Sequence, residues 1–102
     1  MRVDKYLWCV RIFKTRTIAT DACKKEEVIL NGSIPKPSQK ISAGDIVEVK
    51  KAPIWRKFKV LQVIDKRVGA SLVAENVEEI TSKEELDKLK EYIDEKRFYL
   101  NK

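Results

Sequence analysis

The hydrophobic period of this chain changes twice, and the changes limit the kinds of secondary structure that it can form. Residues 3–13 carry five apolar side chains that share one face at the helical step of about 100° per residue: Val3, Tyr6, Leu7, Val10 and Phe13. From residue 28 to residue 64 the apolar residues form short runs or alternate with polar ones, as in strands. Helical spacing returns after residue 82. A chain of 102 residues with this pattern predicts one α+β domain.

Capping and turn residues place the elements within this pattern. A second helix is expected to begin near Thr15, whose hydroxyl can cap a helix N-terminus, and to continue to about Lys25. Strands are expected at residues 28–30, 46–49 and 57–64. These elements predict two N-terminal helices packed on a small, mostly antiparallel sheet.

The end of the chain predicts a further helix. Ser82 and Glu85 have the spacing of a capping box, and Leu86, Leu89 and Ile93 follow at helical intervals. This amphipathic helix completes the expected fold.

Positive charge is concentrated in the first two thirds of the chain, whose net charge is +6 overall. Residues 1–40 carry nine Lys or Arg against four Asp or Glu, and residues 41–67 carry seven against three. Residues 68–102 carry six against nine. The basic surface therefore precedes residue 68, and its partner should be polyanionic.

The residue inventory argues against several classes of function. The chain has no histidine and two cysteines, Cys9 and Cys23, so a Cys/His zinc site or a Cys-His nucleophile cannot be assembled. We expect free thiols packed as small hydrophobic groups, no metal and no cofactor. No stretch approaches the roughly 20 apolar residues that span a bilayer, which predicts a cytoplasmic protein without a membrane segment.

Four stretches carry a resemblance to a known family: "RVDKYLWCVRIFKTRTIA", "VILNG", "KPS" and "AGDIV". Together they resemble the S4-type RNA-binding domain, the helix-helix-strand alpha-L motif. The pattern "R-x-D-K-x-L-W" followed by "R-x-x-K-T-R", and the later segment "DKRVGASLVAENVEEIT", are similar to the ribosome-associated heat shock protein 15 family. We expect residues 1–67 to form the S4-type RNA-binding domain and residues 68–102 a C-terminal extension with an amphipathic helix.

The resemblance implies a protein that binds large (50S) ribosomal subunits on which a nascent chain with its tRNA is stuck, and that assists their recycling or rescue. We expect a monomer, because nothing in the sequence requires a dimer. Its partners would be rRNA and tRNA, with DNA as a secondary one. Two alternatives stay open: a generic rRNA- or tRNA-binding accessory module, and a quality-control factor for nascent-chain tailing. All are RNA-binding roles without catalysis.

The family motif also implies a set of RNA-binding residues. The contacting residues would be Arg2, Lys5, Trp8, Arg11, Lys14, Thr15, Arg16, Asn31, Lys36 and Ser38. Asp4, Gly32 and Pro37 would support them, with Asp4 orienting Arg11 or Lys5. Independently of the family, Lys14 and Arg16 flank an expected helix N-terminus, whose unpaired amides favour phosphate.

One residue departs from the family pattern. The family places a glycine before the first strand, where this chain has Glu26. Glycine ends a helix in the left-handed conformation at little steric cost, whereas glutamate does not. The helix should therefore either end differently or carry strain.

Several residues have a simpler interpretation beside the functional one. Trp8 is either an exposed stacking surface or partly buried against the strands. Four strand lysines are either solvated charges or a second phosphate track: Lys50, Lys51, Lys57 and Lys59.

Two other classes of function compete with RNA binding. An enzyme would need a site that this chain does not offer, because it has neither histidine nor a glycine-rich phosphate loop. A chaperone that holds unfolded clients would need a large exposed apolar patch, yet the apolar stripes are explained by core packing.

Overall fold

The computed structural model describes residues 1–100, and the side chains of residues 1–96. The order of its helices and strands along the chain is α1 (Val3–Cys9), α2 (Arg16–Lys24), β1 (Val28–Leu30), β2 (Ile46–Lys51), β3 (Ile54–Val60), the 3-10 helix η1 (Ala70–Leu72), α3 (Val73–Asn76), β4 (Val77–Glu79) and α4 (Lys83–Leu100). The predicted α+β class is confirmed.

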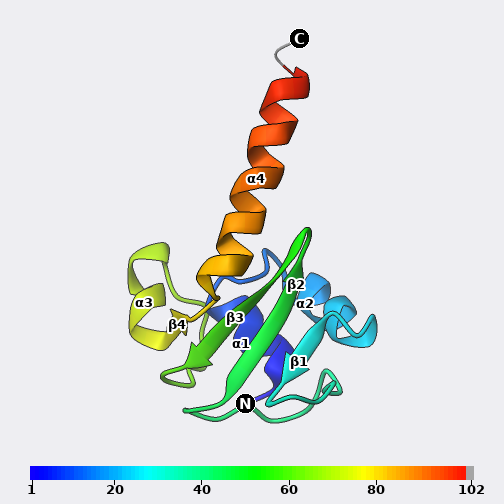
Figure 1. The fold of residues 1–102 in the computed structure, drawn as a ribbon. Helices are drawn as coiled ribbons and strands as arrows, with labels where there is room; N and C mark the ends of the chain where they lie inside the picture. The colour runs from blue at the N-terminus through cyan, green and yellow to red at the C-terminus, as the bar shows by residue number, and fades with distance from the viewer. Residues whose placement is uncertain (101–102) are drawn as a thin grey trace.

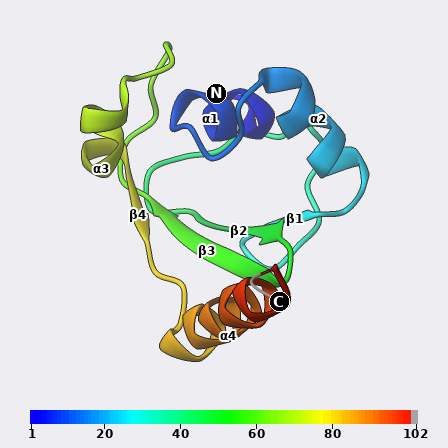
Figure 2. The same cartoon turned by 90° about the horizontal axis from the view of Figure 1, so that it is seen from above.

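The four strands form one antiparallel sheet in the order β1-β2-β3-β4. In the central hairpin Val47 lies opposite Phe58 and Val49 opposite Arg56. Figure 2 shows α1 and α2 on one side of the sheet and α4 on the other. The helix α4 extends well beyond the sheet (Figure 1).

The core lies between the helix pair and the sheet. The five apolar side chains predicted to share one face are all buried: Val3, Tyr6, Leu7, Val10 and Phe13. They belong to one cluster with the inward-facing residues of the strands, including Val47, Val49, Phe58 and Val77. The Tyr6 hydroxyl donates to the backbone oxygen of Asn76 at 2.7 Å, which ties the first helix to the segment before β4.

Both cysteines are free and buried, as predicted. Each lies on the core side of its helix: Cys9 in α1 and Cys23 in α2. Burial raises the pKa of both thiols, to about 11 for Cys23. The thiolate, which is the reactive form, is therefore scarce at neutral pH.

The first helix is shorter than the sequence pattern predicted, since the apolar stripe continued to residue 13. It ends at Cys9, and the chain turns into the left-handed conformation at Arg11, whose φ is 63°. The Arg11 amide donates to Trp8 O and the Ile12 amide to Leu7 O, which is the hydrogen-bond pattern of a Schellman motif. Val10 and Phe13 nevertheless stay in the core, so their burial does not require a continuous helix.

The second helix ends in the same way. Glu26 has a φ of 60°, its amide donates to Cys23 O, and the Glu27 amide donates to Ala22 O. Glu26 thus occupies the left-handed position that glycine fills at little steric cost. The helix therefore keeps the left-handed ending of the family pattern, and Glu26 carries the backbone strain that a glycine would avoid.

The third predicted strand, residues 57–64, is displaced in the structure. The strand β3 covers Ile54–Val60, and the amides of Leu61 and Gln62 both donate to Asn76 O. The chain leaves the sheet there because this carbonyl, distant in sequence, takes both amides. Apolar alternation past residue 60 therefore did not signal a strand.

The C-terminal helix begins where the capping residues predicted. Ser82 Oγ accepts a hydrogen bond from the Glu85 amide at 3.3 Å, and α4 starts at Lys83. Residues 101 and 102 of the predicted extension lie outside the described residues. Within residues 1–100, no helix combines the length and the apolar character needed to cross a membrane.

The strain at Glu26 gives a testable prediction. Replacing Glu26 by glycine should raise the free energy of unfolding by about 0.5 to 1 kcal/mol, because relief of the left-handed strain exceeds the added entropy of the unfolded chain. Urea unfolding measures it. The control is Glu26→Ala, which removes the same charge and keeps the strain. Equal free energies for the two variants would contradict this explanation.

Candidate nucleic-acid interface

The N-terminus of α2 presents the positive end of a helix among exposed cations. Thr15 is the cap residue, and its Oγ1 accepts from the Ile18 amide at 3.1 Å, as its predicted position required. Lys14, Thr15 and Arg16 are all exposed. The cap takes the Ile18 amide, whereas the helix offers no acceptor to the amides of Arg16 and Thr17, so this end favours an anion such as phosphate.

A buried carboxylate joins the two helices beside this end. Asp4 is only 1% exposed, and its Oδ2 accepts from the Thr20 hydroxyl at 2.9 Å. The Arg2 guanidinium grips the same carboxylate with two hydrogen bonds, of 3.1 and 2.9 Å. Thr20 Oγ1 also lies 2.9 Å from Arg16 O, so Asp4 and this carbonyl share the single hydroxyl proton. We call Arg2, Asp4, Thr20 and Arg16 the helix-pair cluster.

Asp4 was predicted to orient the side chain of Arg11 or Lys5, and this prediction was wrong. Asp4 orients Arg2, not the side chain of Arg11 or Lys5, and Lys5 reaches it only through its backbone amide at 2.7 Å. The reason is that α1 begins at Val3, so that Arg2 is the cap residue and can fold back over the first turn.

The charged state of Asp4 is favoured by these contacts. Burial raises the pKa of the carboxyl, but the hydrogen bonds from Arg2, Thr20 and the Lys5 amide outweigh burial and hold the pKa below its usual value. The same pair raises the pKa of Arg2. Asp4 therefore stays ionised at neutral pH and holds one arginine in place, while the Arg2 side chain remains 47% exposed.

The loop at residues 36–40 lies against the start of α1. The Val3 amide donates to Gln39 O at 2.8 Å and the Asp4 amide to Pro37 O at 3.4 Å. Lys36 and Ser38 are exposed in this loop. The structure thus holds the loop that carries these two predicted residues against the start of α1, where Arg2 and Lys40 form an isolated bridge.

The turn at Asn31 and Gly32 has a structural task of its own. Both residues have positive φ, of 49° and 84°. Asn31 Oδ1 accepts from the Ile46 amide at 2.8 Å, and its Nδ2 donates to Asp45 at 3.1 Å. These contacts tie β1 to the start of β2, and an RNA contact by Asn31 stays a prediction.

Two further arginines lie near Trp8, whose side chain is half-buried: Arg67, itself half-buried, and Arg11. The Arg67 Nε donates to Trp8 O at 3.2 Å, and its guanidinium lies 5.8 Å from the centre of the Trp8 ring. Arg11 is exposed and reaches Val68 O at 3.4 Å. Sequence reasoning missed Arg67 here, because the contact joins residues far apart in the chain and the only local signal was a basic pair after the strands.

The side chains that the structure describes do not form a group of His, Cys, Asp or Glu that could hold a metal ion. What the surface offers is fixed arginines, lysines and helix amides. These are groups that bind phosphate.

Comparison with known proteins places the first half of the chain in a known domain family. The S4 domain family matches residues 1–47. The match covers the two helices, which pack on one face of the antiparallel sheet, together with β1 and the start of β2.

Relatives of known name show to which group of S4-domain proteins this chain is similar. The chain is 38% identical over 63 residues to the RQC P-site tRNA stabilizing factor of Helicobacter pylori, covering 62% of this chain and 75% of that protein. It is 38% identical over 72 residues to the heat shock protein 15 homolog of Aeromonas salmonicida, covering 71% of this chain and 54% of the homolog. The chain thus spans about half the length of that homolog. It belongs to the S4-domain family that includes the RQC P-site tRNA stabilizing factors and the heat shock protein 15 homologs.

Solved structures share the fold. The trimeric structure of Vibrio cholerae heat shock protein 15 matches with a TM-score of 0.76 and 26% identity, over 86% of this chain and 87% of that one. The solution structure of the hypothetical protein HP1423 matches with a TM-score of 0.70 and 32% identity, over 81% of this chain and all of that one. The S4-like fold predicted from the sequence is therefore confirmed.

The Asp4 carboxylate predicts how stability depends on pH. Its pKa is lower in the folded protein than in the unfolded chain, so its stabilisation is fully present above the ordinary aspartate pKa and is lost as the pH falls through the lowered value. Asp4→Asn should lower the free energy of unfolding by about 1 to 3 kcal/mol at neutral pH, and by much less at about pH 3.

Urea unfolding of wild type and variant at the two pH values measures this difference. The control is Asp21→Asn, which neutralises an exposed acid on α2 and should change stability little at either pH. An Asp4→Asn deficit of the same size at both pH values would contradict the role of the charge.

Proposed function

We propose that this protein binds RNA on the large ribosomal subunit, at subunits that still carry a nascent chain attached to tRNA, and assists their recycling or rescue. The observation that supports it most is the helix-pair cluster, in which a buried Asp4 holds Arg2 beside the exposed N-terminus of α2. The names of the relatives, with their reference to P-site tRNA, point to the same place of action.

The mechanism is electrostatic docking without chemistry of the protein's own. Arg2 is already restrained by two hydrogen bonds, so less side-chain freedom is lost when it meets a phosphate. Lys14, Arg16 and the first-turn amides of α2 contact the neighbouring phosphates, and folded RNA of the right shape aligns with all of them. The protein acts as a monomer in the cytoplasm, where ribosomes work.

We propose that the boundary at residue 67 separates two roles. The RNA-binding residues implied by the family all precede it, and the net positive charge does too. Residues 68–102 serve the surface indirectly, since the Val68 amide donates to Cys9 O and so fixes the end of α1 near Trp8.

A role in nascent-chain tailing is the second candidate. It is supported by the length of the match, because this chain covers 75% of the Helicobacter RQC P-site tRNA stabilizing factor and 54% of the Aeromonas heat shock protein 15 homolog. In this role the helix-pair cluster and the N-terminus of α2 hold the tRNA while residues are added to the stalled chain. Tail addition on purified stalled subunits, with and without the protein, separates it from recycling.

Binding to purified large subunits tests the proposal. Wild type should prefer subunits that carry nascent chain-tRNA, and log affinity should fall against log salt with a slope of about −3.5 to −4.5 if about five phosphates are neutralised. Arg16→Ala should weaken binding about ten-fold or more and reduce the magnitude of the slope by about 0.7 to 0.9.

The matched control is Lys90→Ala, which removes one positive charge from the exposed side of α4. It should retain both the affinity and the slope of wild type. Equal weak binding of wild type and Arg16→Ala to every RNA, occupied subunit or not, would reject the proposed role of this surface.

A further inference from the structure

Three charged residues occupy positions of the sheet that face the core. Side chains alternate between the faces of a strand, so Lys51 shares the inner face of β2 with buried Val47 and Val49. By the same alternation Arg56 shares the inner face of β3 with buried Phe58, and Glu79 that of β4 with Val77. Apolar residues normally fill such positions, and the charges therefore mark a place where the core is open.

An open cleft of about 440 Å³ lies at this place. Its apolar walls come from the end of α1, the sheet and the η1–α3 segment, and include Val10, Phe58, Val73 and Ala74. This volume is within the range of about 300 to 1,000 Å³ that is usual for small-molecule sites.

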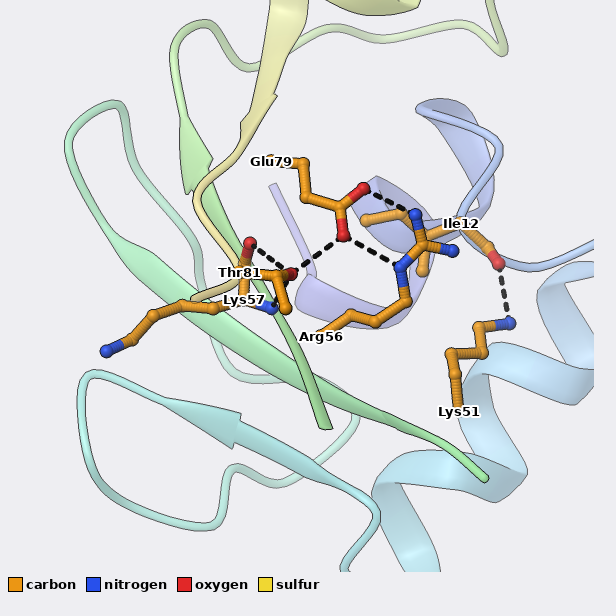
Figure 3. Close-up of polar contacts among 6 residues, drawn as sticks. All are labelled: Ile12, Lys51, Arg56, Lys57, Glu79 and Thr81. Atoms are coloured by element: carbon orange, nitrogen blue, oxygen red, sulfur yellow. Dashed lines mark hydrogen bonds and ion pairs between the residues drawn. The ribbon is translucent and has the colours of Figure 1, made fainter. Parts of the chain in front are cut away.

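The charges of the cleft do not balance. Arg11, Lys51 and Arg56 line it together with one acid, Glu79. Arg56 donates through Nε to Glu79 Oε2 at 2.8 Å and through Nη2 to Oε1, and the Thr81 hydroxyl also donates to Glu79 Oε2, at 2.7 Å (Figure 3). The one acid of the cleft is thus paired with Arg56. The remaining cations leave the cleft with a net positive charge.

Lys51 is held with its ammonium group over an apolar surface. Its Nζ donates to Ile12 O at 2.8 Å (Figure 3) and lies 4.0 Å from the centre of the Phe13 ring. Burial, and then the nearby Arg56, lower the pKa of Lys51. This lysine is thus not the solvated charge that one interpretation of the sequence allowed, and its other N–H groups remain for a ligand.

We propose that this cleft binds a nucleoside phosphate, with the base between the apolar walls and the phosphate at Lys51 and Arg56. An anion alone would need only the cations, and an apolar ligand would need only the walls, whereas a nucleotide uses both. The ligand is either an unpaired nucleotide of an RNA strand or a free nucleotide. The first source rests on the proposed function, and the chemistry of the cleft does not.

Titration of the isotope-labelled 102-residue protein with AMP, adenosine and a single-stranded RNA trinucleotide, followed by amide NMR, tests the proposal. AMP or the trinucleotide should shift the amides of Val10, Ala70 and Val73 in a saturable way. Lys51→Gln should weaken binding of the phosphorylated probes about ten-fold, since glutamine can still donate to Ile12 O but carries no charge. Adenosine should bind weakly and equally to wild type and to this variant.

A second variant tests the walls. Ala74→Phe fills the cleft from the exposed helix α3 without changing any charge, and it should remove binding of all three probes. Lys90→Gln, on the helix that covers the opposite face of the sheet, should bind as wild type does. Unchanged binding in both cleft variants, or shifts spread equally over other basic surfaces, would overturn the proposal.

The probes also separate the two sources. Tighter binding of the trinucleotide than of AMP assigns the cleft to an RNA strand, and the reverse order assigns it to a free nucleotide. No ribosome is present in this experiment. A failure of the cleft is therefore distinguished from a failure of large-subunit binding, which Arg16→Ala measures.

Discussion

The buried charge of Asp4 is the constraint on which the proposed RNA-binding surface depends. A carboxylate that is almost wholly removed from water needs partners, and Asp4 finds them in Arg2, Thr20 and the Lys5 amide. These contacts fix α2 against α1 and hold the Arg2 guanidinium at the carboxylate that meets Thr20, one turn into α2. Asp4 does not itself attract phosphate, but it fixes the position of the Arg2 guanidinium.

Local patterns in the sequence were sufficient for the parts of the fold that local physics controls. The cap at Thr15, the buried stripe with Tyr6 and Leu7, and the start of α4 at Ser82 each depend on residues within a few positions. The end of α1 could not be predicted this way, because an arginine gives no signal for a left-handed turn.

Contacts between distant residues explain the other differences. The end of β3 is set by Asn76, and the environment of Trp8 by Arg67. The cleft behind Lys51 is visible only once the register of the strands shows which face each charge occupies. For the proposed binding surface, the family motif predicted the residues, and the structure shows which of them contact one another.

The bond from Tyr6 to Asn76 also has a consequence for the order in which the protein acquires its structure during synthesis. The first helix leaves the ribosome early. Asn76, whose carbonyl accepts from the Tyr6 hydroxyl, and the core residue Val77 are synthesised some 70 positions later. Closing such a long loop is slow relative to forming local structure, so the N-terminal helices cannot complete their packing while translation is at its midpoint. We expect the domain to become cooperative only when the segment up to β4 has emerged. A chain stopped before residue 76 would leave a tyrosine hydroxyl in the core without its partner, and with it an incompletely folded RNA-binding surface.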